Sequence, residues 1–181
     1  AQAPTTSTAA TVVATTPAPA NASALRLTGF GALDADWDAR HTMVRTPGAT
    51  PGAAYDPLTD WSSRFDGVEH TQGRVVGFGM NWLEPGVEWR VARDEVLALL
   101  PPDAVLVEEG PCSEGKHFLF HSATLGEAFD AGDALQTSDG DRIGSGGYVV
   151  VGLYSFDGPF TGDIDTAIVM IGSEHLNPNG C

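Results

Sequence analysis

The sequence has 181 residues, of which 42% are hydrophobic, so it is long enough to bury the core of one globular domain without a metal ion. Its 24 acidic and 9 basic residues give a net charge of −15, which repels phosphate and opposes binding to nucleic acids and to anionic membrane surfaces. There is no run of about 18 or more apolar residues, so no transmembrane span is predicted.

Residues 1–24 are rich in Ala, Thr and Pro and contain no charged residue. Such a segment cannot bury enough apolar surface to offset its chain entropy, so we expect a disordered tether. Segments of this composition serve as stalks between an anchor and a domain. The sequence therefore predicts a tether over residues 1–24, attached to a membrane or wall through the N-terminus, and a single globular domain over residues 25–181.

The first predicted element of the domain is a helix that begins at Asp34 as its N-cap. Leu33, Trp37, His41 and Val44 recur at helical spacing and form its apolar face. The stretch from residue 51 to residue 73 is polar and predicts only fragments of strand.

A strand is predicted from Arg74 to Trp82, and the clearest helix of the chain follows over residues 92–100, where apolar residues share one stripe. Pro101 and Pro102 end this helix. Short strands are expected at residues 105–107 and 117–121.

The capping-box pattern from Thr124 to Glu127 opens a brief third helix. A loop rich in Asp, Gly and Ser covers residues 131–147, and the two strongest strands, at residues 148–156 and 166–171, form an antiparallel hairpin at the C-terminal edge. This order lacks the regular alternation of parallel α/β proteins. The predicted fold is α+β, an antiparallel sheet with about three short helices packed on one face.

The two cysteines, Cys112 and Cys181, both lie in turn-rich segments, and Cys181 is the last residue printed. A disulfide between them would fasten the C-terminal tail to a mid-chain loop and would place the protein in an oxidising compartment. Two free thiols are the alternative. The tether and the cysteine pair together predict an extracellular or cell-envelope protein, either secreted or lipid-anchored.

His117 and His121 are the most suggestive candidates for a metal site, but on a strand residues four apart are separated by roughly 13 Å, which is too far to share one ion. Aspartates gather in the loops at residues 130–141 and 157–165, yet the calcium-binding pattern of an EF-hand is absent. The glycine motifs of nucleotide-binding loops are also incomplete. We therefore predict no metal and no cofactor.

Two tryptophans have polar neighbours in the sequence, Trp61 and Trp89. An exposed tryptophan often marks a recognition surface, so these two residues are the predicted contacts for a ligand or partner. Partial burial under a loop is the structural alternative for both.

No catalytic residue can be assigned from the sequence. The lack of a recognisable catalytic pattern favours an exported or cell-surface binding domain, with an unidentified protein or small molecule as its partner. The alternative is an exported hydrolase that uses carboxylates, for which Glu84 and Glu88, Asp94 and Glu95, or Glu108 and Glu109 are available pairs. The Ala-rich, Lys-poor composition suggests a bacterial source. The acidity is explained either by solubility or by a high-salt habitat.

Overall fold

The computed structural model describes residues 26–45, 53–58, 63–112, 115–129, 147–155, 162–172 and 176. Within them the helices are α1 (Asp34–Asp38), α2 (Trp89–Leu97) and α3 (Ala123–Ala128). The long strands are β3 (Ser63–Thr71), β4 (Arg74–Asn81), β6 (Val105–Cys112), β7 (Gly115–His121), β8 (Tyr148–Tyr154) and β10 (Thr166–Ile171). The short ones are β1 (Met43–Arg45), β2 (Ala53–Pro57), β5 (Val87–Glu88) and β9 (Asp163–Ile164).

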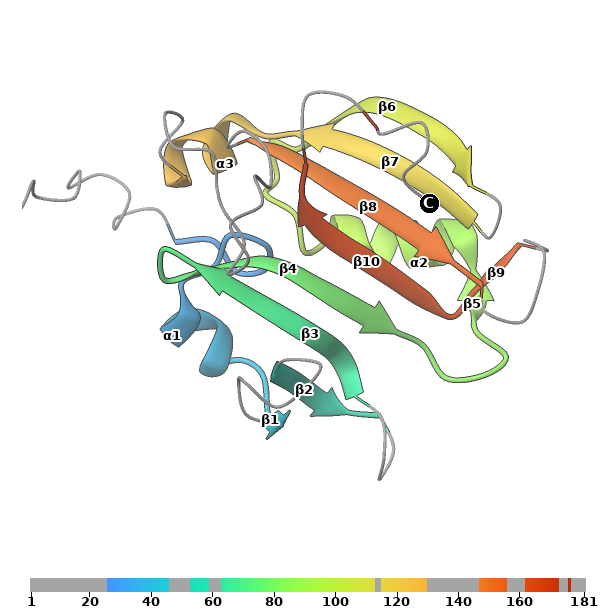
Figure 1. Ribbon diagram of the computed structural model, residues 1–181, viewed down its shortest axis with the longest axis horizontal. Coiled ribbons are helices and arrows are strands. Elements are labelled where there is room, and N and C mark those ends of the chain that lie inside the picture. Colours follow the sequence, from blue (N-terminus) through green and yellow to red (C-terminus); the bar gives the residue numbers. More distant parts are fainter. Residues whose placement is uncertain are drawn as a thin grey trace, which may run out of the picture.

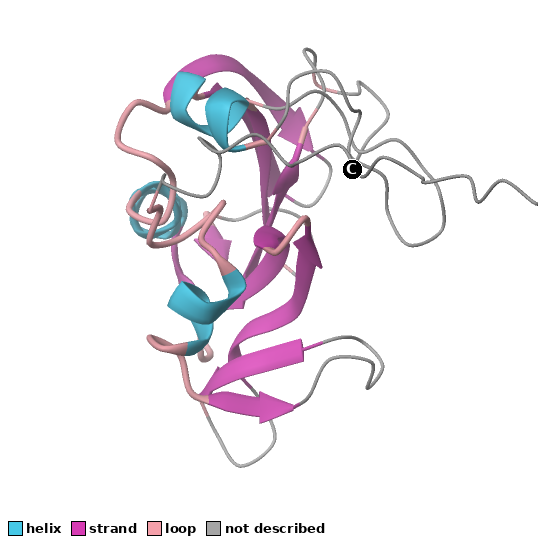
Figure 2. Cartoon of the chain, turned by 90° about the vertical axis from the view of Figure 1, so that its left-hand side faces the viewer, coloured by secondary structure: helices cyan, strands magenta, loops and turns pink. Residues whose placement is uncertain are grey.

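Eight of these strands form one sheet in the order β1-β2-β3-β4-β10-β8-β7-β6, and the pairs in this sheet are antiparallel (Figure 1). Strands β5 and β9 make a separate two-stranded ribbon. The three helices of the described ranges lie on one side of the sheet (Figure 2). Because the sheet dominates, the predicted α+β class describes this fold only roughly.

The core lies between the helices and one face of the sheet. Phe78, Val169, Val151 and Phe118 are in register across β4, β10, β8 and β7, and each is at most 2% exposed. Trp37, from α1, is fully buried against this layer. On the other face of the sheet, the side chains of β10 that alternate with Val169 are partly open to solvent.

The connection between β3 and β4 is a tight turn of two residues, Gln72 and Gly73. Thr71 pairs with Arg74, so only Gln72 and Gly73 connect the strands, and both have positive φ angles, of 54° and 72°. Two successive residues with positive φ are typical of the two-residue hairpin turn that matches strand twist, and glycine adopts this conformation without strain.

Several sequence predictions are confirmed. The helix expected over residues 92–100 corresponds to α2, although α2 begins three residues earlier, at Trp89, and ends at Leu97. The strand expected from Arg74 is β4, and the two C-terminal strands are β8 and β10. The two C-terminal strands pair as predicted, but they occupy the middle of the sheet and not an edge.

The predicted first helix was too long, because α1 ends at Asp38 and Val44 belongs to β1. The side chain of His41 contacts Asp56 on β2, with 2.6 Å between Nδ1 and Oδ2, and the backbone nitrogen of Thr42 donates to the same carboxylate. These contacts draw the chain into the sheet immediately after one helical turn.

The polar stretch at residues 51–73 was also misjudged, because it contains β2 and the nine-residue strand β3. Phe65 and Val68 of β3 are both buried, but register shifts between Asp66 and His70 interrupt the alternation that would have marked the strand.

The third helix begins earlier than predicted, because its N-cap is Ser122 and not Thr124. The predicted tether (1–24) and most of the predicted loop (131–146) lie outside the described residues, as does Cys181. The side chain of Cys112 is likewise not described, so the disulfide stays a prediction.

Candidate functional site

Trp89 is the first residue of α2, and its position is fixed by the short ribbon beside the main sheet. Its backbone nitrogen donates to the carbonyl of Gly162 at 2.8 Å, and Glu88 pairs with Asp163 in the ribbon. The Glu88 side chain then accepts a hydrogen bond from the backbone nitrogen of Arg90 at 3.0 Å, which caps the helix.

The ring of Trp89 is partly buried and packs on the core. It stacks on Phe118 of β7, with ring centroids 6.4 Å apart and an angle of 18° between the planes. Stacking on Phe118 restricts the orientation of the indole ring on the side that faces the sheet. Trp89 therefore has a rigid support of the sort that a recognition residue needs.

Three cations surround this ring. The guanidinium carbon of Arg90 and the ammonium nitrogen of Lys116 each lie 4.4 Å from the ring centroid, and the guanidinium carbon of Arg93 lies 5.5 Å from it. All three are within the range of a cation–π interaction. We call Trp89, Arg90, Arg93 and Lys116 the Trp89 cluster; it holds three of the nine basic residues of the chain.

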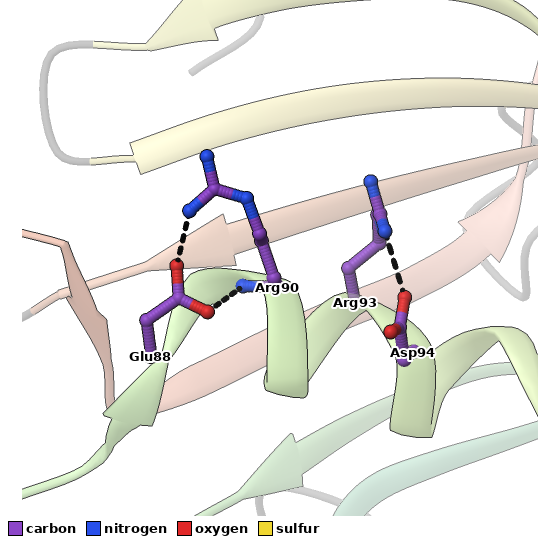
Figure 3. Close-up of polar contacts among 4 residues, drawn as sticks. All are labelled: Glu88, Arg90, Arg93 and Asp94. Atoms are coloured by element: carbon purple, nitrogen blue, oxygen red, sulfur yellow. Dashed lines mark hydrogen bonds and ion pairs between the residues drawn. The ribbon is translucent and has the colours of Figure 1, made fainter.

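The two arginines of the cluster are paired with carboxylates of their own segment (Figure 3). Arg90 Nη1 lies 2.8 Å from Glu88 Oε1, and Arg93 Nη2 lies 2.8 Å from Asp94 Oδ1. Such exposed pairs contribute little to stability and exchange readily with other partners. The Arg90 side chain is 64% exposed, so a ligand can reach it without moving the backbone.

Lys116 differs from both arginines. Within the described ranges no carboxylate lies within ion-pair distance of its ammonium group, which rests on the Trp89 ring. It is also the only lysine in the sequence. A cation that is held on an aromatic ring, with no carboxylate partner among the described residues, is the natural first contact for an anionic group.

A second tryptophan, Trp82, also contacts an arginine, but its polar contacts are to other residues of the fold. Trp82 donates its indole N–H to Glu95 Oε2 at 3.0 Å, and Arg64 lies 4.9 Å from the same ring. Arg64 also pairs with Glu95 and donates to the carbonyl of Asn81. This network links α2 to β3 and β4, so its polar atoms are committed to holding the fold together.

Of the two predicted contact residues, Trp89 lies in the cluster and Trp61 lies outside the described residues. The sequence missed the three cations. Arg93 follows Trp89 by four residues on a helix, a spacing that could have indicated a contact. Lys116 comes from β7, and no local pattern connects it with α2.

The other candidates of the sequence are placed as follows. His117 and His121 both lie on β7; His117 Nε2 is 2.9 Å from the hydroxyl of Tyr154, and burial lowers the pKa of His117. Of the suggested carboxylate pairs, Glu88, Asp94 and Glu95 are in ion pairs with arginines, and Glu108 and Glu109 are exposed on β6. In the part of the chain that can be described, no group of three or more His, Cys, Asp or Glu side chains is arranged to hold a metal ion.

Comparison with models of protein families, with curated proteins and with solved structures finds no match for this chain. Among the described residues, no helix has the length and apolar character needed to cross a membrane.

Proposed function

We propose that this protein is an exported binding domain of the cell envelope, and that the Trp89 cluster is its contact for a carboxylate-bearing partner. The export part of the proposal rests on the composition of residues 1–24 and on the two cysteines. The binding part rests on the geometry of the cluster.

The observation that carries the proposal is the gathering of three cations around one tryptophan ring in a strongly acidic chain. Lys116 and Arg90 lie at the same distance from one ring centroid, and Lys116 has no carboxylate partner among the described residues. Hydrogen bonds between such cations and a carboxylate are among the stronger polar interactions in proteins.

The test is a titration followed by NMR at the indole N–H of Trp89. The probes are blocked triglutamate and trigalacturonate, with triglutamine and the methyl ester of trigalacturonate as their uncharged counterparts. We expect an acidic probe to shift the Trp89 signal and its counterpart to leave the signal unchanged. Which acidic probe binds decides whether the partner is a peptide or a saccharide.

Variants separate a specific site from general electrostatics. Replacing Lys116 or Arg90 with Gln should weaken binding by roughly tenfold, the effect of removing one hydrogen bond between charged groups. Arg26→Gln removes the same charge at a side chain that is 79% exposed and outside the cluster, and it should change binding by less than about twofold. Equal effects of all three variants, or equal binding of charged and uncharged probes, would refute the proposal.

A further inference from the structure

Strand β6 lies at one end of the strand order of the eight-stranded sheet, and no described strand pairs with its outer edge (Figure 1). It has eight residues, whereas β1 at the opposite edge has three. Val105, Leu106 and Val107 are 58%, 51% and 51% exposed. Three consecutive aliphatic residues that are each more than half exposed on a sheet edge form a template for another strand.

The apolar residues of β6 are open on both faces of the sheet. Leu106 pairs with Phe120, so its side chain lies on the face that carries the core, whereas Val105 pairs with His121 on the other face. The register shifts at Val107, which is the extra residue of a bulge. A strand added to this edge would therefore find apolar contacts for side chains on both of its own faces.

Acidic residues flank this apolar segment on both sides. Glu108 and Glu109 follow it directly and are exposed, and Asp103 precedes it by two residues. One carboxylate oxygen of Glu108 accepts a hydrogen bond from the backbone nitrogen of Leu176 at 3.3 Å, whereas the Glu109 side chain makes no hydrogen bond or ion pair to another described residue. No basic residue occurs in β6.

This arrangement of charge opposes pairing with a second copy of the chain. If two β6 strands paired antiparallel around Leu106, Glu108 and Glu109 of each copy would approach the end of the other strand that Asp103 precedes, and like charges close to one another are destabilising. The net charge of −15 on each copy adds a general repulsion. A basic partner would instead be attracted, because its cations would lie beside Glu108 and Glu109.

We propose that β6 binds an extended basic segment of another protein as an added antiparallel strand. Every strand pair of the large sheet is antiparallel, and continuing that pattern fixes the direction of the partner. The lysines or arginines of the partner segment lie opposite Glu108 and Glu109, and they precede the apolar residues in the partner's sequence. The apolar residues that follow lie against the segment from Val107 back to Val105. Main-chain hydrogen bonds supply affinity, and the charges select the partner.

The probe for this site is a blocked, fluorescein-labelled peptide with two lysines followed by alternating valines and threonines. Binding is measured by fluorescence anisotropy at low salt. The same peptide with N-methyl groups on alternate backbone nitrogens should bind at least roughly tenfold more weakly, because it has lost main-chain donors. A peptide with glutamates in place of the lysines, or with the order of the two halves reversed, should lose a comparable amount.

Protein variants locate the contact. Glu109→Gln should weaken binding and reduce its salt dependence, whereas Glu84→Gln, the same change at an exposed residue away from the edge, should not. Leu106→Lys should abolish binding, and a thermal unfolding scan checks that it folds. The proposal is overturned if the lysine peptide does not bind, or if the N-methylated or reversed peptide binds equally well. It is also overturned if sedimentation shows a dimer that Leu106→Lys dissociates.

This site and the Trp89 cluster are tested with probes of opposite charge, so the failure of one proposal does not affect the other.

Discussion

Tyr55 is 1% exposed, and its hydroxyl donates a hydrogen bond to Asp38 Oδ1 at 2.8 Å. Burial of the phenol is the largest cause, and the contact with Asp38 the second, of a pKa raised well above the usual value for tyrosine. In the unfolded chain the phenol ionises near pH ~10, whereas in the folded protein it stays protonated. Its contribution to stability is therefore complete below about pH 10 and is lost as the pH rises further.

We predict that Tyr55 does not contribute to the alkaline titration of the folded protein. The absorbance of tyrosinate near 295 nm, followed to about pH 11, should reach the same amplitude in Tyr55→Phe as in the unchanged protein. Removing the hydroxyl should lower the free energy of unfolding by about 1 kcal/mol, because Asp38 is exposed and water replaces the lost donor. Tyr55 is one of three tyrosines, so a loss of about one third of the amplitude would contradict the prediction.

At the scale of single elements, α3 depends on the hydroxyl of its N-cap residue, Ser122. Ser122 Oγ accepts from the backbone nitrogen of Leu125 at 3.1 Å and donates to Asp103 Oδ1 at 2.7 Å. Desolvation raises the pKa of Asp103, but hydrogen bonds from the Thr124 backbone and from the Ser122 hydroxyl, with others nearby, outweigh it and hold that pKa below its usual value. A depressed carboxyl pKa stabilises the fold above the unfolded value, near pH ~4, and this stabilisation is lost as the pH falls further.

Ser122→Ala should therefore lower the free energy of unfolding by about 1 kcal/mol, the typical cost of losing an N-cap. Glu127→Ala is the matched control, because Glu127 would be the partner in the capping box expected from the sequence. In the structure it is an exposed helix residue, and its loss should cost less than about 0.5 kcal/mol. Urea unfolding of the two variants measures both free energies. If Glu127→Ala lowers the free energy of unfolding more than Ser122→Ala does, the N-cap is Thr124, as the sequence predicted, and not Ser122.

The elements that the sequence predicted well carry their signal locally. Helix α2 buries Ala92 and Val96 on one stripe, and β10 alternates buried Val169 with exposed neighbours. Strand β3 was missed because its bulges break the period of two. Helix α1 was made too long because His41 continues the helical spacing of Trp37, although its side chain is held by Asp56 on β2.

At the scale of the whole molecule, the path of the chain could not be predicted. The last long strand, β10, is inserted between β4 and β8, so it joins segments that are separated by more than sixty residues in the sequence. The Trp89 cluster depends on the same topology, because β7 brings Lys116 onto a ring that belongs to α2. The sequence could therefore identify Trp89 as a candidate but not the cations around it. The exposed aliphatics of β6 were likewise read as an ordinary short strand.

The position of Leu176 bears on whether Cys112 and Cys181 can form a disulfide. The backbone N–H of Leu176 donates a hydrogen bond to the Glu108 carboxylate, and Leu176 Cδ1 lies 3.8 Å from the position that a Cβ atom on Gly110 would occupy. Cys112 lies two residues beyond Gly110 on β6, and five residue steps separate Leu176 from Cys181. An extended chain covers up to about 3.5 Å per residue, so five steps are long enough for Cys181 to reach Cys112.

We predict that these two cysteines form a disulfide when the protein is purified without reductant. Alkylation followed by intact-mass measurement should then modify neither thiol until the protein is reduced. Closing a loop of about 70 residues stabilises a fold by roughly 4 kcal/mol in the chain-entropy model, so reduction should lower the midpoint of urea unfolding clearly. Reductant should not change the midpoint of Cys112→Ser, which isolates the effect of the bond. If both thiols are alkylated without reductant, the chain has two free cysteines, and the case for an oxidising compartment rests on the composition of residues 1–24 alone.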